Sequence, residues 1–289
     1  MNNCNISCDI SHDIVCDLLG LTMLIYDYNK KFILNKNETI EEFLDSFQKN
    51  NELLEELTDA RKNVILDLSD TSSKGKVEEF ISDIDTDLQV GITTSEKNKR
   101  ISIIFRGSES KKDWMHDLNI IKHELEKNVY VHSGFFNQLH KNNVFEKILN
   151  KTKELIENNP EYSIYITGHS LGAALSTLCG YQLSNEITDK ITVVNFASPR
   201  IGNMNFKNKC NNKDNLCIYR ITNDRDIVTA TPMINFKHVG TNIRITENKI
   251  DLYKNNSYPW WYYSLWYCWR ISDHNVDLYY ERLVKHKWN

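Results

Sequence analysis

The stretch Tyr162–Leu183, YSIYITGHSLGAALSTLCGYQL, limits the fold of this chain more than any other segment. Its first residues are β-branched and apolar on one face, which predicts a buried strand. After Gly168–Gly172, apolar residues recur at helical spacing: Leu171, Ala174, Leu175, Leu178, Cys179 and Leu183. A strand, a turn with glycine at both ends and a helix are the context of the nucleophile elbow G-x-S-x-G. We therefore predict that Ser170 is a nucleophile held in a strained turn; an ordinary glycine-rich loop is the alternative.

The length and charge of the chain exclude several classes of protein. With 289 residues it can bury a large core, and we expect a single domain spanning 1–289. The net charge is −4, so there is no basic footprint and we expect no nucleic-acid partner. No apolar run approaches the roughly 20 residues of a membrane span, so we expect no transmembrane segment.

The N-terminal sequence and the cysteines bear on the compartment. The first residues, MNNCNISCDISHD, show neither the basic nor the apolar region of a secretory signal. We therefore expect an intracellular, cytoplasmic protein whose seven cysteines are reduced thiols. No cysteine spacing matches a zinc site, so we expect no metal.

Two helices are predicted before the main domain. Residues 10–28 form a short apolar segment, and Thr39–Arg61 has an amphipathic pattern that begins with the capping box Thr39-x-x-Glu42. We expect residues 1–75 to form a helical extension that packs on the main domain.

An oxyanion hole needs two N–H groups, and the sequence offers two candidates. Leu171 follows the nucleophile directly, so its N–H group is the first. Strands are predicted at 88–94 and 101–105, and the second ends at Arg106-Gly107-Ser108. Ser108 is the candidate for the second donor; a polar turn after a strand is the alternative.

The segment 109–125 has a helical pattern, with Trp114, Leu118, Ile121 and Leu125 near one face. Beside an oxyanion loop, such a helix is typical of a mobile lid, and equally of a fixed surface helix. A further helix is predicted over 137–158 and ends before Pro160. His132, which precedes it, is interpreted as a structural hydrogen-bonding residue.

The remaining two members of a catalytic triad are sought near strand ends. The predicted strand 216–222 runs into the acidic loop Asn223–Val228, where Asp226 precedes an apolar pair that can anchor the loop. We therefore prefer Asp226 to Asp224, although both are typical of exposed turns. His274 lies on a loop before the last helix, and the order Ser170…Asp226…His274 is that of an α/β-hydrolase. His238 within a predicted strand and His286 near the end are poorer candidates.

An aromatic insert, residues 258–271, contains four of the six tryptophans. Indole and phenol rings favour a membrane–water interface. The insert is interpreted as an interfacial surface, a wall of an acyl site or a buried aromatic cluster.

Seven motifs in order resemble the class 3 lipases, the fungal triacylglycerol lipase family with its plant and protist relatives. They are Phe105–Ser108 (FRGS), Asp113–Asn119 (DW…DLN), His132–Phe135 (HSGF), Gly168–Leu175 (GHSLGAAL), Phe196–Asn203 (FASPRIGN), the Asn223–Val228 acid loop and Asp273-His274. The resemblance covers roughly Val77–Leu283. It implies an α/β-hydrolase fold, a Ser170–Asp226–His274 triad, an oxyanion hole from Ser108 and Leu171, and a lid near Glu109–Asn119 with Trp114 and Leu118.

We therefore expect a mostly parallel sheet flanked by helices, with antiparallel edge strands, and a serine esterase acting on lipid esters such as triacylglycerols. The chemistry needs no metal or organic cofactor. A peripheral contact with a membrane or a lipid droplet is also expected. A phospholipase A1 or an acyltransferase would share these residues, and a non-catalytic lipid-binding protein is the alternative outside the enzymes.

Overall fold

The computed structural model describes residues 10–27, 62, 75–107, 121–232, 234–253 and 270–288. Its centre is an eight-stranded sheet in the order β1-β2-β3-β6-β7-β8-β9-β10. The strands are β1 (Gly75–Asp83), β2 (Leu88–Ser95), β3 (Arg100–Phe105), β6 (Ser163–His169), β7 (Ile191–Phe196), β8 (Leu216–Asn223), β9 (Thr241–Ile245) and β10 (Ile250–Tyr253). The run from β3 to β9 is parallel, whereas β1, β2 and β10 pair antiparallel at the edges. The predicted sheet is confirmed.

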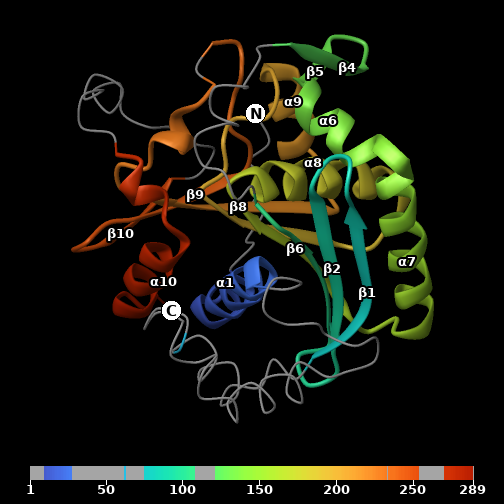
Figure 1. The fold of residues 1–289 in the computed structure, drawn as a ribbon, viewed down its shortest axis with the longest axis horizontal. Coiled ribbons are helices and arrows are strands. Elements are labelled where there is room, and N and C mark those ends of the chain that lie inside the picture. The colour runs from blue at the N-terminus through green and yellow to red at the C-terminus, as the bar shows by residue number, and fades with distance from the viewer. Residues whose placement is uncertain are drawn as a thin grey trace.

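The central strands carry nearly continuous apolar sequence because helices cover both faces of the sheet. On one face lie α6 (Ser133–His140), α7 (Val144–Asn158), α8 (Leu171–Glu186) and α9 (Met204–Asn211). On the other lie α1 (His12–Asp27) and α10 (Val276–Lys285), as Figure 1 shows. Each layer has its own apolar core, and α8 is buried almost all round because it packs against β3, β6 and β7.

The helix α1 confirms the apolar helix predicted at 10–28 and is tied firmly to the sheet. Asp17 forms a buried ion pair of 2.5 Å with Arg100 at the start of β3. The hydroxyl oxygens of Thr22 and Thr167 are 3.0 Å apart, and His12 Nε2 donates to the Leu283 carbonyl oxygen at 2.9 Å. This helix therefore forms part of the core. The predicted second helix, 39–61, lies outside the described residues, and the extent of the N-terminal extension stays a prediction.

The helix predicted over 109–125 is wrong at its C-terminal end. Residues Lys122–Glu126 form β4, which pairs antiparallel with β5 (Val129–His132) in a separate hairpin. Asn128 adopts a φ of 65°, which permits the tight turn between the strands. In β4, exposed and half-buried residues alternate, so strand pairing overrides the helical spacing of the apolar residues.

The helix predicted over 137–158 is interrupted. The helices α6 and α7 are separated by the 3₁₀ turn η1 (Lys141–Asn143), because Asn142 and Asn143 take left-handed φ angles of 53° and 57°. Asparagine tolerates this conformation better than most residues. The structural interpretation of His132 is supported, since its Nδ1 caps α6 by accepting the Gly134 N–H at 3.1 Å.

One of the four described cysteines differs from the sequence expectation. Cys16, Cys179 and Cys210 are free, whereas Cys217 is disulfide-bonded. The expectation of seven reduced thiols is therefore wrong for Cys217, and its partner is none of the three free cysteines. Among the described helices, none is long and apolar enough to cross a membrane.

Candidate active site

Ser170 lies between β6 and α8. Its backbone has φ 58° and ψ −121°, a conformation that residues other than glycine rarely adopt. The flanking glycines make this turn sterically feasible. A Cβ atom on Gly168 would lie 2.5 Å from the carbonyl of Gly172, and one on Gly172 would collide with the Phe105 carbonyl oxygen. The strained turn predicted from G-x-S-x-G is therefore present, and the side chain of Ser170 lies at the carboxyl edge of the parallel strands.

The structure brings together the three residues that the sequence nominated from distant segments. His274 Nε2 is 2.8 Å from Ser170 Oγ. His274 Nδ1 lies 3.0 Å and 2.9 Å from the two carboxylate oxygens of Asp226. Because a carboxylate only accepts hydrogen bonds, Nδ1 carries the proton and Nε2 is left to accept the serine hydroxyl. All three side chains are buried, with Ser170 only 2% exposed.

The carboxylate of Asp226 has two further donors. The Val228 N–H donates to Oδ1 at 3.0 Å, so Asp226 caps the 3₁₀ turn η2 (Ile227–Ala230) that follows it. The Tyr279 hydroxyl on α10 donates to Oδ2 at 2.7 Å. These donors hold the carboxylate in one position, aimed at His274. Sequence analysis missed the contact of Tyr279 because its helical spacing is that of an ordinary core residue.

The acid loop and the histidine turn are joined by Asn223, the last residue of β8. Its side-chain Nδ2 donates to the Asp273 carbonyl oxygen at 3.0 Å, in the 3₁₀ turn η6 (Ser272–His274). Its backbone N–H donates to the Tyr279 hydroxyl at 2.9 Å. One fully buried residue thus fixes the relative position of the two segments that carry Asp226 and His274.

The poorer candidates lie elsewhere. Asp224 forms an ion pair with Arg244 on β9, and His286 Nε2 is 3.0 Å from the Glu247 carbonyl oxygen. His238 is buried and contacts the Thr229 carbonyl oxygen.

Of the two proposed oxyanion donors, only Leu171 lies within the described residues. Leu171 is the first residue of α8, so no carbonyl of the helix accepts its N–H group. Ser108 lies outside the described residues, directly after Gly107. The Tyr26 hydroxyl lies where a Cβ atom of Gly107 would be and is 3.0 Å from His169 Nδ1. The helix α1 therefore contributes to the packing around the oxyanion loop.

The proposed lid residues, Trp114 and Leu118, and the aromatic insert up to residue 269 also lie outside the described part of the chain. Arg270 lies within the described residues and is bonded to the loop Asn223–Val228. Its N–H donates to the Arg225 carbonyl at 2.7 Å, and its carbonyl accepts the Ile227 N–H at 3.4 Å. The polypeptide that enters the histidine turn is therefore paired with the backbone around Asp226.

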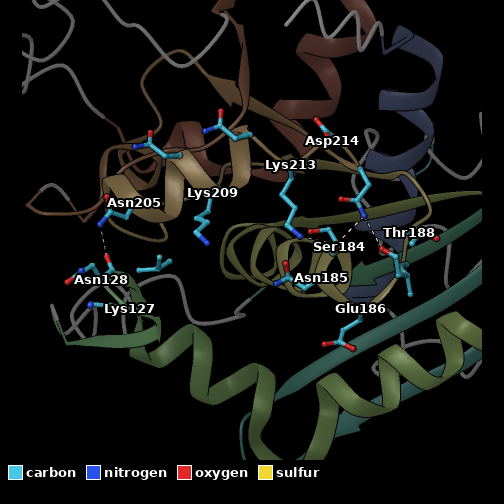
Figure 2. Close-up of a pocket in the computed structure, with 15 residues that line it drawn as sticks. Lys127, Asn128, Ser184, Asn185, Glu186, Thr188, Asn205, Lys209, Lys213 and Asp214 are labelled. Atoms are coloured by element: carbon cyan, nitrogen blue, oxygen red, sulfur yellow. Dashed lines mark hydrogen bonds between the residues drawn. The ribbon is translucent and has the colours of Figure 1, made fainter. Parts of the chain in front are cut away.

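A polar pocket of about 880 Å³ lies away from these residues (Figure 2). It is formed by the turn between β4 and β5, the end of α8, α9 and the loops before β7 and β8. These two loops lie at the amino edge of the parallel strands, opposite Ser170. Lys213 Nζ and Asn215 Nδ2 both donate to the Ser184 carbonyl oxygen, at 3.0 Å and 3.1 Å. We interpret the pocket as structural, because these bonds tie the connections between the central strands to α8. Within the described residues, no group of histidine, cysteine or acidic side chains could hold a metal ion.

Comparison with known proteins shows to which family the middle of the chain belongs. A family model described as Lipase (class 3) matches residues 102–236. This segment belongs to the class 3 lipase family. The matched segment includes Ser170 and Asp226 but ends before His274, which the fold brings next to Ser170. The resemblance read from the seven motifs is thereby confirmed.

Proteins similar to this chain are found in plants and fungi. A phospholipase A1-II 3 of Oryza sativa subsp. indica is 30% identical over 199 residues, covering 58% of this chain and 47% of that protein. A secreted mono- and diacylglycerol lipase A of Penicillium cyclopium is 28% identical over 156 residues, covering 53% and 50%. The chain thus spans about half the length of these relatives.

Solved lipase structures share the α/β-hydrolase fold. A mutant form of MDLA from Penicillium cyclopium has a TM-score of 0.70 at 21% identity, covering 93% of this chain and 99% of that one. A triacylglycerol lipase described as having a serine protease triad at its catalytic centre has a TM-score of 0.64 at 25% identity, covering 73% and 85%. The predicted fold class is therefore confirmed.

Proposed function

We propose that this protein is a serine hydrolase of carboxylic esters of lipids, with Ser170 as nucleophile, His274 as base and Asp226 as the acid that orients it. The observation that carries the proposal is the contact of 2.8 Å between His274 Nε2 and Ser170 Oγ, with Asp226 on the far side of the same ring. A buried serine with a histidine base and a fixed carboxylate is the arrangement that activates a hydroxyl for acyl transfer.

In the first half-reaction, His274 Nε2 takes the proton of the Ser170 hydroxyl as Oγ attacks the ester carbonyl carbon. The carbonyl oxygen becomes an oxyanion, which the N–H of Leu171 stabilises together with the proposed N–H of Ser108. Asp226 stabilises the imidazolium that forms. The C–O bond of the ester then breaks, and His274 returns the proton to the departing alcohol.

In the second half-reaction, water replaces the alcohol. His274 removes a proton from the water, whose oxygen attacks the acyl carbon. The second tetrahedral intermediate collapses to release the fatty acid, and Ser170 Oγ recovers its proton from His274. These steps use only the side chains named here and water.

Turnover of a short p-nitrophenyl ester tests the proposal directly. We expect Ser170→Ala to lower kcat by about 10⁴- to 10⁶-fold, because it removes the nucleophile. Ser176→Ala is the matched control, since this buried serine on α8 bonds only the Ala173 carbonyl oxygen within the described residues. Full esterase activity in Ser170→Ala would overturn the proposal, and a wild-type protein without turnover would favour a lipid-binding role.

The relatives favour two lipid classes as substrate. The rice relative is named a phospholipase A1, and the Penicillium relative a mono- and diacylglycerol lipase. We propose lipid esters as the substrate class, with triacylglycerol first and the sn-1 ester of a phospholipid as the second candidate. A panel of triacylglycerol, diacylglycerol and phosphatidylcholine, each compared with Ser170→Ala, separates these candidates.

Access to Ser170 requires movement, because its side chain is buried. Exposed apolar side chains, Ile121, Ile234 and Ile271, lie on segments next to the described ends of the chain or to the histidine turn. We propose that these apolar side chains contact a lipid surface and that segment 109–119 acts as a lid. The rate should then rise as the substrate passes from monomers to aggregates; an unchanged rate would contradict the lid.

A further inference from the structure

We infer that His238 is a positioning residue for the catalytic acid, which it holds in place through the turn η2. This inference rests on the proposed function, because it concerns how Asp226 is presented to His274. No motif of the sequence assigns His238 a role, and it lies outside the segment matched by the lipase family model.

The contacts form a short path from His238 to Asp226. His238 Nε2 donates to the Thr229 carbonyl oxygen at 2.6 Å. The Thr229 hydroxyl in turn donates to the Asp226 carbonyl oxygen at 2.7 Å, and the Val228 N–H of the same turn donates to the Asp226 carboxylate. The turn therefore binds both the backbone and the side chain of Asp226, and His238 is bonded to that turn through the Thr229 carbonyl oxygen.

The imidazole of His238 is fixed as a neutral donor. A carbonyl oxygen only accepts, so the proton lies on Nε2. Burial lowers the pKa of His238 well below its ordinary value, and the positive charges of Arg220, Arg200 and Lys207 lower this pKa further. These cations come from β8, from the loop after β7 and from α9, whereas η2 contributes the carbonyl that accepts the bond.

His238 and His274 therefore have different roles. The ring of His274 faces the carboxylate of Asp226, which holds the proton on Nδ1 and leaves Nε2 for Ser170. The ring of His238 faces cations, which disfavour its protonation. His238 thus keeps the acid loop in one arrangement while His274 changes its protonation state.

The test compares His238→Leu with His238→Gln, whose amide N–H can reach the Thr229 carbonyl. Activity is measured per active site, counted by titration with a phosphonate ester, so that unfolded protein does not enter kcat. We expect His238→Leu to lose about 10- to 100-fold in kcat with KM unchanged, the size expected for a displaced catalytic group. We expect His238→Gln to recover most of this loss.

Two readouts separate positioning from general stability. The acid limb of the kcat/KM profile should move to lower pH in His238→Leu, because Asp226 then stabilises the imidazolium of His274 less well. In an Asp226→Asn background, His238→Leu should lower kcat by less than about threefold, because the carboxylate that His238 positions is gone. The matched control is His12→Leu, which removes another buried bond from histidine to a carbonyl, far from the triad. It should lower stability and leave kcat unchanged.

Wild-type kcat in His238→Leu, an unmoved acid limb, or an undiminished loss in the Asp226→Asn background would overturn the inference. If His238→Leu does not fold, Thr229→Val removes only the hydroxyl bond to Asp226, and wild-type kcat in that variant would overturn it equally. Esterase activity that survives Ser170→Ala would instead overturn the proposed function. Activity that needs Ser170 but ignores His238 and Thr229 overturns the positioning role alone.

Discussion

At the scale of single residues, the geometry around Ser170 depends on groups that take no direct part in the proposed acyl transfer. Asp226 reaches His274 with both oxygens, yet its carboxylate also receives the Val228 N–H and the Tyr279 hydroxyl. The fixed carboxylate is what selects the tautomer of His274 that can accept the serine proton. The proposed chemistry therefore depends on the hydrogen bonds around the acid as much as on the acid itself.

Removing the hydroxyl of Tyr279 tests this dependence. Tyr279→Phe deletes a hydrogen bond to a charged group, worth about 1.5–3 kcal/mol, part of which is lost in the transition state. We expect kcat to fall by about 3- to 30-fold with KM unchanged. The measurement is steady-state hydrolysis of a p-nitrophenyl ester. Tyr280→Phe, on the same helix, serves as control, and equal activity in both variants would contradict the role of Tyr279.

Sequence reasoning reached the residues whose local context is distinctive and missed those whose partners are remote. Ser170 lies in a motif with glycines that sterics require, and Asp226 and His274 follow from strand ends and chain order. Tyr279 and His238 have no such local signal. Each acts on the acid loop through a contact between segments that only the fold brings together.

At the scale of elements, α1 closes the sheet face beneath the elbow and is anchored by a buried ion pair. Asp17 on α1 and Arg100 on β3 are both largely shielded from water. Breaking such a pair from one side leaves a buried charge without compensation, which costs more than the pair itself contributes. The stability of the N-terminal part of the core should therefore depend on Asp17.

We predict that Asp17→Asn lowers the free energy of unfolding by about 3–5 kcal/mol. Chemical denaturation followed by circular dichroism measures this change. The exposed pair Lys99–Glu161 provides the control, since Glu161→Gln should change stability by less than about 1 kcal/mol. Equal effects of the two substitutions would show that burial of the Asp17 pair does not decide its contribution.

The helices and strands were predictable where one spacing of the apolar residues dominates the sequence. The strands β3, β6 and β7 and the helix α8 follow from continuous apolar runs and helical spacing. The strand β4 was not predicted, because Ile121 and Leu125 continue a helical spacing of apolar residues and the pairing with β5 decides the outcome. The break at Asn142 and Asn143 depends on left-handed backbone, which the sequence permits without requiring.

At the scale of the whole molecule, several ionisable groups make stability depend on pH in the same direction. Burial lowers the pKa of His238 and of the half-buried His140. The pKa of Glu126 is also lowered, by the hydrogen bond from Lys209 and then by that from Tyr181. For each group the folded protein resists a proton that the unfolded chain accepts, so unfolding takes up protons as the pH falls.

We therefore predict that the free energy of unfolding decreases as the pH falls through about 6.5, where half of the unfolded histidine is charged. The contribution of Glu126 is lost at lower pH, below the pKa of an unfolded glutamate. Replacing His238 by Gln should make the free energy of unfolding depend less steeply on pH. The slope should fall by up to about 1.4 kcal/mol per pH unit, the value for one proton. Urea denaturation at a series of pH values measures the slope, and stability that rises on acidification would contradict this account.

The central claim is that Ser170 is the activated nucleophile of this molecule, and labelling with a fluorophosphonate tests it most directly. Mass spectrometry of the digested protein should find one phosphonyl group per chain, on the peptide that contains Ser170. The labelling rate should fall by at least about 10³-fold in His274→Ala, because the base that activates the hydroxyl is gone. A label on another residue, or a rate that does not change without His274, would contradict the account.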